Sequence, residues 1–273
     1  MELENEKLEN NEIEEVVYEE AKGFAYFIAW LKSFPITAIL MLIAIILFCF
    51  SNYYALTLFK NYPENTSYAL GLLKTGGVLG GPSQIFIWDG QLWRLLVNIF
   101  HHGNFLHIFF NLYALYFFGA ISEKFMGKIH YLLFIIFCSI FQQTICQITI
   151  EPGAIGLSGV IFGLFGFLWI LKDKKEIKPF ITKDLSKAMF VQFFIFIILT
   201  YFDLMNIANV GHFSGFIYGV LFALALYKKP SMIKVIAFTL SHLLLIPAIF
   251  YIYQPVYDKD WQEWKKEQEL KKE

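Results

Sequence analysis

The chain has 273 residues, of which 57% are hydrophobic and only 16% are charged. A soluble domain has about a quarter of its residues charged, so the composition excludes an ordinary soluble fold. The formal net charge of −1 argues against nucleic acid as a main partner. The three cysteines have no metal-type spacing, and we expect them to be unpaired packing residues within apolar runs.

The apolar residues form separate runs of membrane-spanning length, a pattern typical of an all-α polytopic membrane protein. The first run, 35–59, follows an acidic arm with nine glutamates in its first 20 residues and no sign of a cleavable signal peptide. Residues 60–104 form a connection that contains Gly and Pro, and we expect it to be partly embedded in the membrane. The later runs are 105–121, 129–150, 158–171, 188–204, 211–227 and 233–253.

The lysines indicate how these runs cross the membrane. They gather after the second, fourth and sixth runs, most densely over residues 172–187, whereas the turns after the third and fifth runs have none. The positive-inside rule therefore predicts that the lysine-rich ends and the N-terminus are cytoplasmic. The second, fourth and sixth runs then all enter from the outer face. Polar residues in their first turns should reach a similar depth in one leaflet.

One of these residues is Ser158, which stands between glycines at the start of the fourth run, in the stretch Gly156-Leu157-Ser158-Gly159. A helix N-terminus favours developing negative charge, and Gly156 and Gly159 allow close backbone approach. The run is about 14 residues, or roughly 21 Å, so its outer end should lie below the membrane surface. These features favour a submerged nucleophile. The alternative is a serine that bonds back to its own helix.

The sixth run begins with His212, and an ionisable residue inside a membrane run is a functional candidate by default. Gly215 and Gly219 follow it at a spacing of four, and the fourth run repeats this spacing at Gly159 and Gly163. Small residues at this spacing let two helices approach closely, which would bring His212 beside the serine as a general base. A simple interhelical hydrogen bond is the alternative.

No carboxylate is placed to orient that histidine, because Asp203 at the end of the fifth run is better explained as an interfacial residue. A Ser-His dyad is therefore favoured over a triad. His107 and Asn111 share one helix face at a spacing of four, and both can donate hydrogen bonds to an oxyanion. They could instead be a structural polar pair. A metal site at His101, His102 and His107 is a further alternative, but no HExxH pattern or carboxylate ligand accompanies these histidines.

Together these motifs resemble the rhomboid family of intramembrane serine proteases, over about residues 91–227. The resemblance implies a six-helix core with Ser158 as nucleophile, His212 as general base, and an oxyanion hole from His107, Asn111 and the Ser158 backbone N–H. It also implies that the Trp93-Arg94 loop braces the core. The chain then divides into an acidic cytoplasmic arm (1–33), the protease core (34–229, with its long first loop at 60–104), and an extra transmembrane helix with a charged tail (230–273).

The function that this resemblance implies is hydrolysis of peptide bonds in transmembrane segments of other membrane proteins, through an acyl-enzyme. We expect no metal and no cofactor, and the location would be the lipid bilayer of a bacterial plasma membrane. One alternative is a rhomboid-like protein that binds membrane helices without cutting them. Another is a transporter or channel, although the two halves of the chain show no internal repeat.

Overall fold

The structure is a computed structural model that describes residues 23, 25–61, 87, 90–149, 154–240, 262, 263 and 266. All regular structure within these residues is helical, with no strand, which confirms the predicted all-α class. The expectations for the acidic arm up to residue 22, for much of the first connection, and for the seventh run beyond residue 240 fall outside the described residues.

The helices follow one another as α2 (Pro35–Asn61), α5 (Arg94–Val97), a 3-10 turn η3 (Asn98–Phe100), α6 (Phe105–Ala114), a π-helical turn η4 (Leu115–Gly119), α7 (Ala120–Met126), α8 (Lys128–Ile148), α9 (Ser158–Ile170), α10 (Lys183–Tyr201) and α11 (Asn209–Leu226). By length and composition, α2, the continuous segment from α6 to α7, α8, α10 and α11 can each cross a membrane. The apolar α9 is shorter, at 13 residues. Residues 232–240 are also helical, and the rest of the seventh run stays a prediction.

The helix ends differ from the ends of the hydropathy runs where polar residues cap or continue a helix. Hydropathy predicts that the fifth run begins at Ala188, but α10 begins at Lys183 because the Thr182 hydroxyl accepts a hydrogen bond from the Leu185 backbone N–H at 3.1 Å. Hydropathy predicts that the second run ends at Ile121, whereas its helix continues to Met126. Hydropathy marks the apolar part of a helix, and capping sets where the helix ends.

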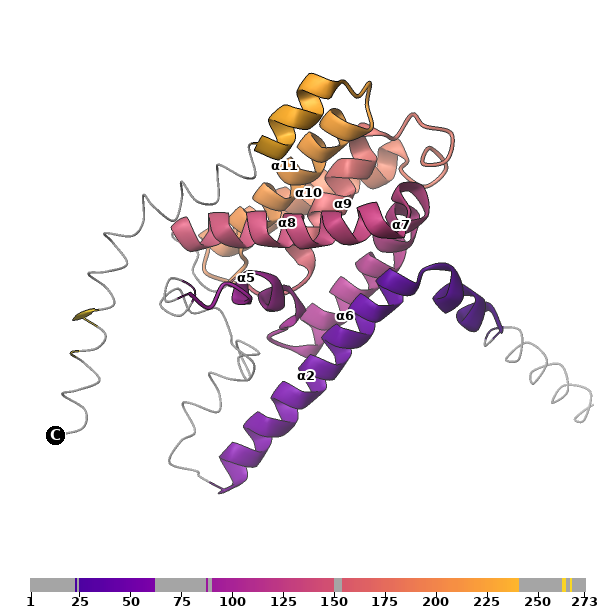
Figure 1. Ribbon diagram of the computed structural model, residues 1–273. Helices are drawn as coiled ribbons and strands as arrows, with labels where there is room; N and C mark the ends of the chain where they lie inside the picture. Colours follow the sequence, from indigo (N-terminus) through magenta and orange to yellow (C-terminus); the bar gives the residue numbers. More distant parts are fainter. Residues whose placement is uncertain are drawn as a thin grey trace, which may run out of the picture.

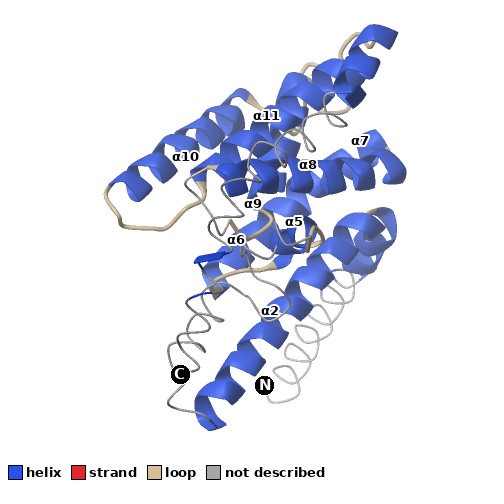
Figure 2. Cartoon of the chain, turned by 60° about the vertical axis from the view of Figure 1, so that its left-hand side comes forward, coloured by secondary structure: helices blue, strands red, loops and turns tan. Residues whose placement is uncertain are grey.

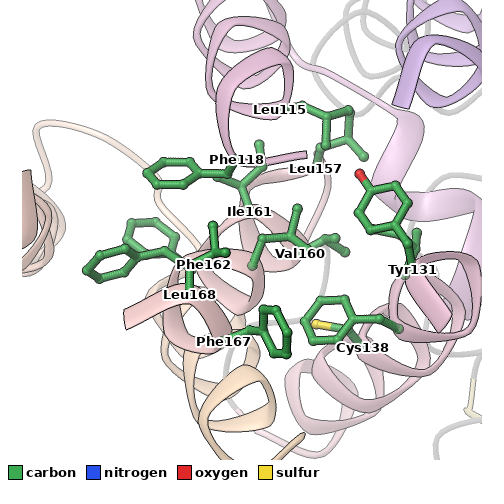
Figure 3. Close-up of a cluster of buried hydrophobic side chains, with 14 of the residues drawn as sticks. Leu115, Phe118, Tyr131, Cys138, Leu157, Val160, Ile161, Phe162, Phe167 and Leu168 are labelled. Carbon is green, nitrogen blue, oxygen red and sulfur yellow. The ribbon is translucent and has the colours of Figure 1, made fainter. Parts of the chain in front are cut away.

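The short helix α9 lies at the centre of the bundle (Figure 1). All of its residues from Gly159 to Leu168 are buried. A helix that is apolar on every side is stable only where other helices surround it. Here α11 and α8 pack along it, and α6 and η4 cover its other side. Figure 3 shows Val160, Ile161 and Phe162 of α9 within the resulting core, close to Leu115 and Phe118 of η4.

Glycines allow α9 and α11 to approach until their backbones touch. A Cβ atom added at Gly215 would overlap the carbonyl oxygen of Gly159, and one at Gly219 would overlap that of Gly163. The structure therefore brings together the two glycine pairs that the sequence singled out. On another side of the bundle, α2 lies beside α6 in both views (Figure 1, Figure 2).

Candidate active site

Ser158 is the first residue of α9, and the loop before it is held from two sides. The Gly156 backbone N–H donates to the carbonyl of Asn98 at 3.2 Å, and the side-chain amide of Gln143 donates to the carbonyl of Ala154 at 3.1 Å. Gly156 has a φ of +99°, a conformation that favours glycine. The loop that presents the serine is thus fixed by η3 and α8, a role that the sequence did not indicate for Asn98 or Gln143.

The closest polar neighbour of this serine is His212, in the first turn of α11. The imidazole Nε2 lies 2.7 Å from the Ser158 hydroxyl oxygen, which is hydrogen-bond distance. The imidazole is buried, and its Nδ1 has no hydrogen-bond partner among the described residues. Asp203 is exposed and does not serve as one. The serine and histidine therefore meet as a pair of side chains from two helices.

Two aromatic rings lie against the imidazole of His212. The ring of Phe162, one turn after Ser158 on α9, lies 4.8 Å from it between centroids, at an interplanar angle of 36°. Phe196 of α10 lies 5.5 Å away at 42°. Sequence reasoning missed both, because a phenylalanine in a membrane run is most simply a lipid-facing or core residue. The spacing of four residues from the serine was the one signal that could have identified Phe162.

His107 and Asn111 lie one turn apart on α6, whose N-terminus is capped by Asn104; its side-chain oxygen accepts from the His107 backbone N–H at 2.8 Å. Both side chains face the loop before Ser158. A Cβ atom added at Gly156 would lie 2.6 Å from the His107 Nε2 and 3.2 Å from the Asn111 Nδ2. The Asn111 Nδ2 is buried and has no hydrogen-bond partner in the described part of the chain. Two potential donors thus converge on Gly156, two residues before the serine.

The other two histidines of this region, His101 and His102, are buried just before α6. Burial lowers the pKa of His101 to about 4 and that of His102 to about 3, so both are neutral at pH 7. The His102 Nδ1 donates to the carbonyl of Phe100 at 3.0 Å, and its ring lies 4.9 Å from that of His107. Among the described residues, no group of three potential metal ligands is assembled here or elsewhere.

Trp93 and Arg94 lie at the start of α5, at the end of the long connection. The Arg94 Nε donates to the side-chain oxygen of Gln91 at 2.8 Å, whereas the Trp93 side chain is 57% exposed. The element that packs inward is η3, all three residues of which are buried. A bracing role for Trp93 and Arg94 themselves stays a prediction.

Comparison with known proteins places these features in a family. Residues 89–229 match the family model described as "Rhomboid domain". The chain is 30% identical over 135 residues to the rhomboid protease GlpG of Yersinia pestis (strain Pestoides F). The aligned stretch covers 49% of this chain and 48% of that protein. It is 29% identical over 154 residues to the rhomboid protease GlpG of Photorhabdus laumondii, covering 53% and 54% of the two chains.

The chain thus spans about half the length of the curated relatives that it matches. The family match itself extends over more than half of this chain, from the end of the first connection through α11, and it includes Ser158, His212, His107 and Asn111. With its several apolar membrane-spanning helices, this chain is an integral membrane protein that belongs to the rhomboid family.

Proposed function

We propose that this chain is an intramembrane serine endopeptidase that cleaves transmembrane segments of other membrane proteins by a Ser-His dyad. The observation that supports this most directly is the 2.7 Å contact between the Ser158 Oγ and the His212 Nε2. A serine hydroxyl is a weak nucleophile near neutral pH and needs an adjacent base within hydrogen-bond reach. The relatives from Yersinia pestis and Photorhabdus laumondii are named as rhomboid proteases, which supports the same activity.

In the proposed reaction, the Ser158 Oγ attacks the scissile carbonyl carbon while the His212 Nε2 takes the hydroxyl proton. The tetrahedral intermediate collapses, the carbon–nitrogen bond breaks, and His212 gives its proton to the leaving amine. A water molecule, deprotonated by the same imidazole, then attacks the carbonyl carbon of the acyl-enzyme. The bond between this carbon and the Ser158 Oγ breaks, and His212 returns the proton to the serine. No described residue bonds the Nδ1, so we assign these proton transfers to Ser158 and His212 alone.

The negative oxygen of the tetrahedral intermediate needs fixed hydrogen-bond donors. We assign this role to the His107 and Asn111 side chains and to the backbone N–H of Ser158, which lies at the N-terminus of α9. The convergence of the two side chains on Gly156 supports the assignment. Removal of one such donor typically lowers kcat by about 10²–10³-fold.

We further propose that the substrates are transmembrane proteins with a locally unwound segment, because the carbonyls of an intact helix are hydrogen-bonded and shielded. The lysine-rich connection between α9 and α10 would be cytoplasmic, together with the N-terminus, in a bacterial plasma membrane. Ser158, at the opposite end of α9, would then act in the outer leaflet. The catalytic core would comprise residues 34–229, without metal or cofactor.

The test is cleavage of a model transmembrane substrate by the purified full chain in proteoliposomes. Ser158→Ala should abolish cleavage, since loss of a serine nucleophile costs about 10⁶-fold in kcat. Ser214→Ala is a matched control, because Ser214 is a buried serine outside the proposed dyad. Its hydroxyl donates to the carbonyl of Val210 in the same helix, α11, at 2.7 Å. Undiminished cleavage by Ser158→Ala would refute the mechanism.

Covalent labelling separates a protease from a protein that only binds membrane helices. A fluorophosphonate should label Ser158 of the unmodified chain and should fail to label the Ser158→Ala variant. Labelling should also be lost in His212→Ala, because the hydroxyl then has no base. An unlabelled but correctly folded wild-type chain would favour the non-proteolytic alternative.

A further inference from the structure

A single hydrogen bond is recorded for the His212 side chain among the described residues. Its Nε2 lies against the Ser158 hydroxyl, and its buried Nδ1 has no hydrogen-bond partner in the described residues. In a Ser-His-Asp triad, a carboxylate bonded to that second nitrogen holds the imidazole in its working orientation. Something else must restrict rotation of the ring here.

The aromatic packing supplies that restriction. Phe162 and Phe196 both lie against the imidazole, at centroid distances of 4.8 and 5.5 Å. The two phenylalanine rings also contact each other, at 6.4 Å and nearly perpendicular. One ring belongs to the helix of the serine, whereas Phe196 comes from α10, which carries none of the proposed catalytic groups.

The helix that supplies Phe196 is only lightly packed. In its most apolar window 11% of α10 is buried, the lowest value among the five membrane-spanning segments identified in the described part of the chain. Its two buried residues, Ser186 and Met189, are both in its first half. In its second half, the ring contacts run through Phe193, which lies 4.2 Å from Phe162, and through Phe196. That half of α10 is therefore held by Phe196, which contacts the imidazole, and by Phe193, which contacts Phe162. A hydrogen bond of 2.7 Å from the Asn209 side chain of α11 to the Thr200 hydroxyl also holds it.

We propose that Phe196 is a positioning residue for the general base, and that it makes the orientation of His212 depend on the packing of α10 against α9 and α11. With α10 packed, the imidazole is held against Phe162 with its Nε2 toward Ser158. With the second half of α10 displaced, one side of the imidazole is uncovered and the base loses its orientation. The inference rests on the proposed function and adds to it a residue outside the dyad and the oxyanion donors.

Phe196→Ala should lower kcat at least 10-fold with KM within about 2-fold of wild type, because small misplacements of a catalytic group cost up to about 10²-fold. Fluorophosphonate labelling of Ser158 should slow by a similar factor. Because this small reagent needs no substrate site, slower labelling would report on the serine and its base and not on substrate binding. Phe196→Tyr, which keeps the ring, should restore both rates. Ile197→Ala is the matched control, since the neighbouring Ile197 is 52% exposed.

Phe196→Leu guards against a folding defect, because it keeps most of the side-chain volume but has no flat ring face. Its thermal midpoint should stay near that of wild type while its labelling rate falls. The inference would be overturned if the folded Phe196→Leu variant were labelled at the wild-type rate. It would also be overturned if Phe196→Ala raised KM at unchanged kcat, because that result would assign Phe196 to substrate binding. If the unmodified chain itself is neither labelled nor active, the proposed function fails instead, so the two failures are distinguishable.

Discussion

The carboxyl group of Glu123 in α7 accepts two hydrogen bonds from Thr37 in α2, one from its backbone N–H at 2.8 Å and one from its hydroxyl at 2.7 Å. The other carboxyl oxygen accepts from the backbone N–H of Ile36 at 3.0 Å. Free N–H groups of the first turn of α2 are thereby satisfied by a residue 86 positions away in the sequence. A negative group at this place also complements the dipole of α2.

Glu123→Ala should therefore destabilise the protein strongly. Glu123 is 3% exposed, and its removal takes away the acceptor of the part-buried Ile36 backbone N–H and of the buried Thr37 backbone N–H. Hydrogen bonds to a charged group contribute about 1.5–3 kcal/mol each, and we expect a loss of at least about 3 kcal/mol. Thermal unfolding in detergent would measure it. Glu176→Ala, at an exposed glutamate, is the control, and equal midpoints for the two variants would contradict the assigned role.

The contact between α9 and α11 gives a second prediction. Gly219→Ala should lower the thermal midpoint and the cleavage rate together, because the added methyl group overlaps the carbonyl of Gly163 and must push the helices apart. Overpacking of this kind costs about 1–3 kcal/mol, and the displacement would separate Ser158 from His212. The matched control is Gly23→Ala, where nothing lies within 4 Å of the added atom. A Gly219→Ala protein with unchanged stability and rate would show that the backbones need not touch.

The sequence was sufficient to identify the polar groups that meet at the site. His212, His107 and Asn111 stand out because ionisable and amide side chains are costly in apolar helices unless they have partners. Ser158 stands out because it begins a short apolar run between glycines. The glycine spacings, in turn, indicated which two helices approach closely. These signals are local in the chain, so a single sequence contains them.

Contacts set by the rotation of a helix could not be predicted in the same way. Asn111 and Glu123 are 12 residues apart, which at about 100° per residue would place them on different faces of one regular α-helix. The π-helical turn η4 lies between them, adds about one residue to the turn, and so changes which face the residues after it occupy. Phe196 was missed for a similar reason, because only the rotation of α10 distinguishes it from its lipid-facing neighbours.

The buried histidines before α6 predict a pH dependence of stability. In the unfolded chain each binds a proton below about pH 6.5. In the folded protein burial lowers the pKa to about 4 for His101 and about 3 for His102. The unfolded state thus binds more protons between these values, so stability should fall as the pH is lowered from about 6.5 toward 4. The slope should be up to about 1.4 kcal/mol per pH unit for each histidine.

Unfolding free energies measured across this pH range would test that slope. The double variant His101→Gln, His102→Gln should reduce the slope, whereas His130→Gln, at an exposed histidine, should leave it unchanged. A wild-type protein whose stability does not decrease below pH 6.5 would show that neither buried histidine resists protonation.

Gly156 provides the sharpest test of the proposed oxyanion donors. Gly156→Ala should lower kcat by about 10²-fold or more, because the new methyl group would meet the His107 Nε2 at 2.6 Å and the Asn111 Nδ2 at 3.2 Å. The substitution also strains a backbone with a φ of +99°. Gly127→Ala separates the two effects, since Gly127 has a φ of +78° but nothing within 4 Å of the added atom. Steady-state cleavage and thermal unfolding of both variants would be compared. Both variants should be less stable because of backbone strain, but only Gly156→Ala should have a lower kcat among the molecules that remain folded. Equal kcat values for the two variants would remove His107 and Asn111 from the proposed oxyanion hole.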